Sequence, residues 1–394
     1  MTTRMRSQAG FTLLELLVAM GVMLVVLAGT TQLLTSAMSG EVAASQTLTM
    51  NGHLRAAMDL LQRDLIQAGQ GLPVGRRIGV VNGSGAERIE RPGPPANGSC
   101  VGVTAYPDEP SLPAVSVGPD IGPPIDGQCT DVITIFAADN MFGQVPIAAI
   151  AANGTTAVIH DSVDISDDPD VEGDNLRPGD LLMLTKNNES VLMQVTAVSG
   201  QTVTFGTGDA DDPLHLNQFR ADVNDDTFRG TINRYVAAAP SDPTTPQADA
   251  NDPTGQRQGA SLATRIRLIS YFVDTSGQVP RLMRSIGGAD PNAVAIGVER
   301  FRVSYDLADQ AGNPTNVRMT NADLNGTGAC PDDPTTLDEV EGCSENQIRK
   351  VNVVLSMKVE NDNASAQLKH GQQARSTLYS QVSLRSLAFV DRYQ

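Results

Sequence analysis

Basic residues are scarce in this chain of 394 residues. Lys and Arg number 28 against 45 Asp and Glu, which gives a formal net charge of −17. A phosphate-binding surface needs clustered Lys and Arg, because released counterions drive that association, and the sequence contains no such cluster. The composition therefore argues against nucleic acid as a partner and favours a soluble, exposed surface.

Catalytic signatures are also missing from the sequence. It contains no G-x-S-x-G elbow, no Walker A loop and no H-E-x-x-H pair. The four histidines are scattered, with no nucleophile motif beside them: His53, His160, His215 and His370. We therefore expect a protein that is not an enzyme, with its histidines on the surface or in packing positions.

Cysteine is rare, and no C-x-x-C pair is present, which disfavours a zinc site. The four cysteines, Cys100, Cys129, Cys330 and Cys343, allow three disulfide pairings. In an oxidising compartment we favour the pairing that is local in sequence, Cys100 with Cys129 and Cys330 with Cys343. Four unpaired thiols are the alternative.

A weak calcium pattern stands in an Asp-rich segment. Asp222, Asn224 and Asp226 alternate like the first ligands of an EF-hand loop. The pattern then fails, because Thr227 stands where the sharp-turn Gly belongs and Asn233 where the bidentate Glu belongs. Such clusters are usually solvated loop residues, so we expect no cofactor and keep calcium as a minor alternative.

The most informative segment is an apolar run near the N-terminus. From Phe11 to Leu34, 17 of 24 residues are apolar and Glu15 carries the only charge. About 20 apolar residues are enough to cross a bilayer. Arg4 and Arg6 precede the run, and positive flanks stay in the cytoplasm. The sequence predicts a cytoplasmic leader at 1–10, a membrane span at 11–34 and a body outside the inner membrane.

An ordinary secretory signal peptide is the alternative explanation of this segment, with cleavage near Gly29. Glu15 argues against it, because a carboxylate at mid-bilayer costs about 2.5 to 3.5 kcal/mol. An export signal gains nothing from that cost. Something in the functional protein should therefore compensate the charge.

The residues Gly10-Phe11-Thr12-Leu13-Leu14-Glu15 resemble the type III signal of type IV prepilins and pseudopilins. The resemblance implies that a prepilin peptidase cuts after Gly10 and methylates the new amine of Phe11. The Phe11 ammonium and the Glu15 carboxylate would then neutralise each other, within one subunit or between neighbours in a filament. Either arrangement removes an unpaired charge from lipid.

A second helical pattern follows the apolar run and makes 35–70 an amphipathic segment. Apolar residues recur there mostly three or four apart: Leu48, Leu54, Ala57, Met58, Leu61 and Leu65. The next Pro is Pro73, and glycines before it supply a stop signal. We predict one helix over 11–68, with an anchoring first half and a second half packed on a head.

Strand signals dominate the rest of the chain. Residues 71–128 are rich in Gly and Pro and are expected to be irregular, and 129–394 is expected to be a β-rich head with an inserted lobe at about 164–260. Predicted strands are 132–136, 181–185, 191–198, 202–205, 265–273, 300–305, 351–359 and 378–390. The segments from 181 to 205 suggest a β-meander. The fold class is α+β, type IV pilin-like, with a long helix on an antiparallel sheet.

The resemblance extends beyond the signal to PilW-type minor pilins. It rests on residues 55–69 at the helix end and on four later stretches: 271–273, 279–284, 297–305 and 382–385. It implies a subunit that leaves the inner membrane for the pilus, joins other minor pilins and the major pilin, primes assembly and sits near the tip. A PilY-type adhesin would be a further partner.

Two other functions remain open at this point. Similar helix ends occur in J-type pseudopilins of type II secretion, although those chains are usually shorter. A membrane-anchored periplasmic binding protein, sensor or enzyme would use the same anchor without the peptidase.

Overall fold

The structure is a computed structural model of the chain. It describes residues 12–72, 77–80, 89–94, 100, 111–151, 155–161, 163, 165, 176–186, 189–206, 212–217, 262–287, 290–307, 348–358 and 375–384. The chain forms two compact units, one of 1–52 with 358–376 and one of 53–357 with 377–394. We call the second unit the head.

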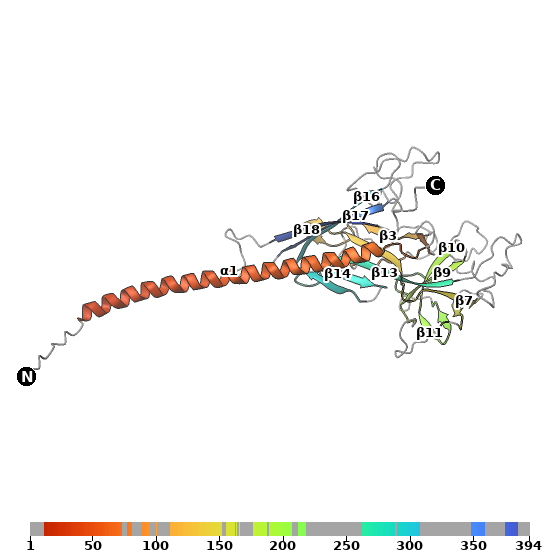
Figure 1. The fold of residues 1–394 in the computed structure, drawn as a ribbon, viewed down its shortest axis with the longest axis horizontal. Helices are drawn as coiled ribbons and strands as arrows, with labels where there is room; N and C mark the ends of the chain where they lie inside the picture. The colour runs from red at the N-terminus through yellow and green to blue at the C-terminus, as the bar shows by residue number, and fades with distance from the viewer. Residues whose placement is uncertain are drawn as a thin grey trace, which may run out of the picture. The chain divides into compact units, whose positions relative to one another are not determined.

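One long helix, α1 (Leu13–Gln67), carries the N-terminal part of the chain (Figure 1). Its 55 residues correspond to about 82 Å at 1.5 Å per residue. Four glycines that could have interrupted it, Gly21, Gly29, Gly40 and Gly52, all lie within the helix. A Cβ at any of these positions would meet no other described segment within 4 Å, so steric fit does not require glycine there.

The helix ends at a pair of left-handed glycines. Gly69 has φ 73° and Gly71 has φ 71°, a conformation that favours glycine. The amide of Gly69 donates to the carbonyl of Phe136 at 2.8 Å, and Ala138 donates back to Gln70 at 2.8 Å. A Cβ on Gly71 would lie 2.5 Å from that of Ala138, so this close approach to the sheet requires glycine.

Every described element after the helix is a β-strand, which agrees with the predicted α+β class. Their bounds are β1 (Arg77–Gly79), β2 (Ser111–Pro113), β3 (Val115–Gly118), β4 (Pro124–Ile125), β5 (Gln128–Cys129), β6 (Val132–Ala138), β7 (Gln144–Ile150), β8 (Thr156–Ile159), β9 (Leu181–Lys186), β10 (Glu189–Gln194), β11 (Ala197–Ser199), β12 (Thr202–Thr204), β13 (Leu262–Asp274), β14 (Arg281–Ile286), β15 (Asn292–Ile296), β16 (Val298–Leu307), β17 (Ile348–Lys358) and β18 (Arg375–Ser383). The segment 71–128, expected to be irregular, thus contains short strands.

Strand β13 organises the largest sheet, in which 11 strands are described. Its residues Leu262–Thr264 pair with both β7 and β9, and Ile269–Tyr271 pair with both β6 and β14, always antiparallel. A separate three-stranded sheet has the order β16-β17-β18. One long strand therefore gives two groups of strands a common partner.

The predicted meander of 181–205 is wrong in its connections. β9 pairs with β10 and β11 pairs with β12, but β10 and β11 lie at opposite ends of the path β10-β9-β13-β7-β8-β12-β11. The expected single strand at 191–198 is broken at Val195 and Thr196. Val195 donates to the carbonyl of Asp180 and Thr196 to that of Thr204, each at 2.8 Å, so the backbone changes partners there.

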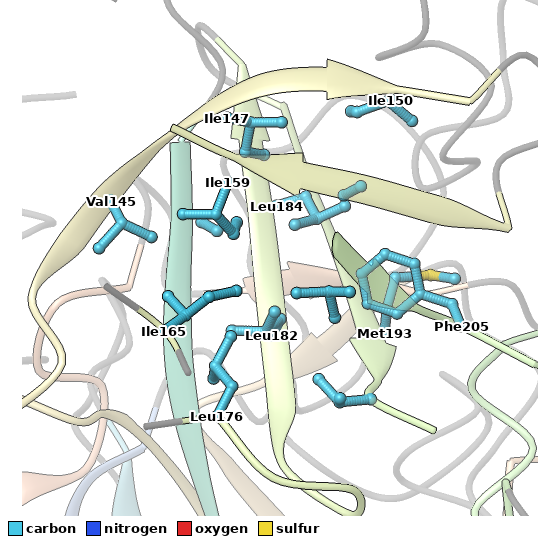
Figure 2. Packing of buried hydrophobic residues seen from close by; sticks show 14 of the residues in the cluster. Val145, Ile147, Ile150, Ile159, Ile165, Leu176, Leu182, Leu184, Met193 and Phe205 are labelled. Carbon is cyan, nitrogen blue, oxygen red and sulfur yellow. The ribbon is translucent and has the colours of Figure 1, made fainter. Parts of the chain in front are cut away.

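An apolar cluster fills the region of β7 to β12 (Figure 2). It contains Ile147, Leu182, Leu184, Met193 and Phe205, all fully buried. The cluster begins at Phe142, earlier than the lobe expected at about 164–260, and its strands share β13 with the rest of the sheet. Residues 218–261 lie outside the described part of the chain, so a separate lobe stays a prediction.

Candidate functional site

The N-terminus of α1 is closed by a reciprocal pair of polar residues. The amide and hydroxyl of Thr12 both donate to Oε2 of Glu15 at 3.0 Å, and the amide of Glu15 donates to the Thr12 hydroxyl at 3.3 Å. This is a capping box, in which two side chains satisfy backbone donors left free at a helix start. Contacts within its own chain thus hold Glu15 at the start of the helix.

The predicted cleavage point lies just before this cap. Gly10 and Phe11 are outside the described residues, so cleavage after Gly10, methylation of Phe11 and the Phe11–Glu15 charge pair stay predictions. The structure places Glu15 in the first turn of α1, where the helix dipole favours a negative side chain.

The apolar turns that follow have no cover within the described part of the chain. The large apolar side chains from Leu13 to Leu34 are between 56% and 80% exposed. This part of α1 reaches a mean hydropathy of 2.3, and none of that stretch is buried, so it is long and apolar enough to cross a membrane. A surface of this kind needs lipid or other apolar helices around it.

A model of one protein family matches the same stretch of chain. Residues 5–31 match the prokaryotic N-terminal methylation motif. The chain carries a prepilin-type signal. No curated protein and no solved structure matches the chain. The motif indicates a precursor of the type IV pilin or pseudopilin type, which implies processing by prepilin peptidase, assembly with other pilins and membrane anchoring before assembly.

The second part of α1, from residue 53 onward, belongs to the head and packs against its strands. Five of the six residues predicted to share its apolar face are buried to within 2% exposure: Leu54, Ala57, Met58, Leu61 and Leu65. The sixth, Leu48, is 73% exposed, so the buried face starts later than predicted. Gln62 also donates to the hydroxyl of Ser380 on β18 at 2.6 Å.

A buried ion pair fastens this part of the helix to the sheet. Asp64 on α1 accepts from Arg284 on β14 through both carboxylate oxygens, at 2.7 and 3.1 Å. The hydroxyl of Tyr271 on β13 donates to the same carboxylate. Asp64 and Tyr271 are buried, and the Arg284 side chain is only 16% exposed. Two-point Arg–carboxylate contacts fix geometry as well as charge.

Titration of the trio follows from burial and from this pairing. Burial first, and then the hydrogen bond to the Asp64 carboxylate, raise the pKa of Tyr271 well above its usual value. Burial alone would lower the pKa of Arg284, but the hydrogen bonds and charge of Asp64 outweigh it, so the pKa is raised. Tyr271 therefore remains a neutral donor and Arg284 a cation throughout the physiological range.

Sequence reasoning missed this trio, although all three residues lie inside the stretches that carried the family resemblance. A signal was present: Asp64 follows Leu61 by three residues, a spacing that puts it beside Leu61 and Leu65 on the apolar face of the helix. An acid on a buried face needs a partner, because an unpaired buried charge is costly. The sequence could not show that the partner lies on β14, 220 positions later.

One predicted disulfide lies in the described part of the chain. Cys100 and Cys129 are joined, with their Cα atoms 6.0 Å apart. The loop beside it is held by Asp131, which accepts from the amides of Asp120 and Val303 at 3.0 and 2.8 Å. Cys330 and Cys343 lie outside the described residues, so their pairing stays a prediction.

The calcium candidates Asp222, Asn224 and Asp226 also lie outside the described residues. Within the part that is described, no group of three or more His, Cys, Asp or Glu side chains could hold a metal ion.

Proposed function

We propose that this protein is a minor pilin of PilW type, a structural subunit that primes assembly of a type IV pilus near its tip. The observation that carries the proposal is the prepilin-type signal at 5–31 running into apolar helix turns that the described chain leaves uncovered. In a filament, the corresponding helices of neighbouring subunits would cover them. Other minor pilins and the major pilin are the partners, with a PilY-type adhesin beyond them.

The size of the head supports a place at the tip. Eleven described strands gather on one sheet and three more form another. Bulky β-rich heads are hard to repeat along a closely packed shaft but have room at an end. The type II secretion pseudopilin is the rival function, and a deletion strain separates the two: loss of pili with normal secretion supports the pilin, and the reverse result supports the pseudopilin.

The capping box suggests how the cleaved N-terminus would work. Cleavage after Gly10 would create a positive amine on Phe11, next to Thr12, whose amide and hydroxyl already hold Glu15. The carboxylate would then meet the amine of its own chain or of a neighbour, which neutralises both charges inside an apolar environment.

Mass spectrometry of the mature N-terminus tests the proposal most directly. We expect a chain that begins with N-methyl-Phe11; an intact Met1 or an N-terminus near Thr30 would contradict it. Glu15→Val should leave cleavage intact and reduce incorporation into pili. Glu41→Val removes an exposed acid from the same helix and serves as the matched control, with incorporation unchanged.

A further inference from the structure

A cleft of about 590 Å³ opens in the head, and no residue of α1 is among its described lining. It lies where the start of β9, the end of β10, the middle of β13 and the end of β14 meet, and small-molecule sites typically measure about 300 to 1,000 Å³. Leu181 and Ile266 contribute buried apolar surface to its lining. The size suits a compact ligand.

The cleft contains a buried acceptor that lacks a donor. Gln194 is 2% exposed, and its Oε1 has no hydrogen-bond partner among the described residues. The backbone of Gln194 is held by Asn217, which accepts from its amide and donates to its carbonyl, each at 2.8 Å. The backbone of Gln194 is therefore fixed at the cleft wall, and a buried amide oxygen is normally paired with an O–H or N–H group.

Both carboxylates in the described part of the lining already have partners. Asp139 accepts from Arg265 at 2.8 and 3.0 Å, and the Arg265 guanidinium lies over the Phe142 ring, 5.2 Å from its centre. Asp180 accepts from the amide of Arg177 at 2.9 Å and lies 3.7 Å from Arg265. Because Arg265 lies close to both carboxylates, their repulsion of a bound anion is reduced.

Two more guanidinium groups, those of Arg177 and Arg267, belong to the described lining of the cleft. Arg177 and Arg267 form no salt bridge or side-chain hydrogen bond within the part of the chain that is described, although both line the cleft. Among the described lining residues, the three cations, with Arg265 included, exceed the two carboxylates by one charge. This local positive excess sits on a chain whose net charge is −17, so the cleft would attract anions that the rest of the surface repels.

We propose that this cleft binds a small organic monocarboxylate that also carries an O–H or N–H donor. The carboxylate would accept from Arg177 and Arg267, the donor would meet Oε1 of Gln194, and the carbon skeleton would lie on Leu181 and Ile266. A single excess positive charge matches a monocarboxylate better than a phosphate dianion. The two sources of this chemistry are an acidic sugar and the carboxyl end of a peptide.

Calorimetric titration of the full chain in detergent tests the proposal with glucuronate and N-acetylalanine. Saturable binding of either acid, with no binding of glucose, is the expected result. Glucuronate alone identifies an acidic sugar, N-acetylalanine alone identifies a peptide end, and each supports the proposal. Inorganic phosphate that competes as well as the acids, or glucose that binds equally, would overturn it. So would the absence of saturable binding for both acids.

Three variants locate the binding. Arg267→Gln and Gln194→Leu should each weaken it on the order of 10-fold, as expected for one lost charge-assisted contact or one lost buried acceptor. Arg300→Gln, which removes an exposed cation on β16 outside the cleft, should leave it unchanged. Equal affinity in Arg267→Gln, with an unfolding midpoint like that of the native chain, would place the ligand elsewhere and overturn the proposal.

Discussion

Two stretches of α1 both carry large apolar side chains but have opposite surroundings. From Leu13 to Leu34 these side chains are more than half exposed, whereas Leu54, Leu61 and Leu65 are at most 2% exposed. The second stretch finds its partners in the head of the same chain. The first finds none among the described residues, so lipid or other subunits are its natural partners. A prepilin-type signal at residues 5–31, which overlaps the first stretch, agrees with that division.

The ion pair in the second stretch offers the strongest test of this contrast. Asp64→Leu should lower the free energy of unfolding of the head by about 3 to 5 kcal/mol, because it leaves the Arg284 charge buried without its partner. Urea unfolding of the full chain in detergent would measure the loss. Adding Arg284→Met should recover most of it, and Asp59→Leu, at an exposed position of the same helix, should change little. If Asp59→Leu lowered the free energy of unfolding as much as Asp64→Leu does, the role of the ion pair would be contradicted.

Matched leucines compare the two stretches directly. Leu65→Ala should cost the head about 2 to 5 kcal/mol through lost burial and the cavity that remains. Leu24 is 64% exposed. Leu24→Ala should therefore change the free energy of unfolding of the head by no more than about 0.5 kcal/mol. Hydrogen exchange of the strands would report both effects. If Leu24→Ala destabilised the head as strongly as Leu65→Ala, the division of the helix would be wrong.

The disulfide belongs to the head alone, so its loss should leave the anchor untouched. Cys100→Ser should lower the stability of the head by about 2 to 4 kcal/mol, since the loop between the two cysteines would no longer be constrained in the unfolded chain. The share of protein recovered in the membrane fraction should not change. Reductant added to the native chain should cause at least this stability loss, since it would also open the predicted Cys330–Cys343 bond. A loss of membrane retention would contradict the separation of the two stretches.

The helix cap should give the smallest effect. Thr12→Ala removes the hydroxyl that donates to Glu15 and caps the first turn, at a cost of about 0.5 to 2 kcal/mol to the helix start. Faster amide exchange over the first turn, with the head unchanged, is the expected result. Thr12→Ser keeps the hydroxyl and should behave like the native chain, while slow exchange in Thr12→Ala would show that the cap contributes nothing.

Much of the fold follows from local patterns. The helix was predicted over 11–68 and is described from Leu13 to Gln67, because its apolar periodicity and terminal glycines are visible in a short window. β6, β13, β16 and β17 were predicted near their observed bounds for the same reason. β7, β8, β14 and β15 were not among the predicted strands. The meander was misconnected because β9 pairs with β13 and β12 with β8, and such pairings depend on residues far apart in the chain.

The candidate site divides in the same way. The signal, the span and Glu15 were recognised from the sequence, since one acid in a long apolar run is a local feature. The Thr12–Glu15 cap could have been predicted from the T-x-x-E spacing. The Gln194 cleft could not, because its lining comes from segments between Asp139 and Gly287 that only the sheet brings together.

By itself, the sequence determined that a positively charged flank is followed by an apolar helix with one acid, because hydropathy and charge are properties of neighbouring residues. Only the tertiary structure decided which half of that helix is covered, that Asp64 meets Arg284, and that two arginines and a buried glutamine share one cleft. Those outcomes depend on β13, which pairs with its neighbour β14 and with three strands that are distant in the sequence, β6, β7 and β9. No local window carries that information, because pairing energy is realised only when the whole sheet forms.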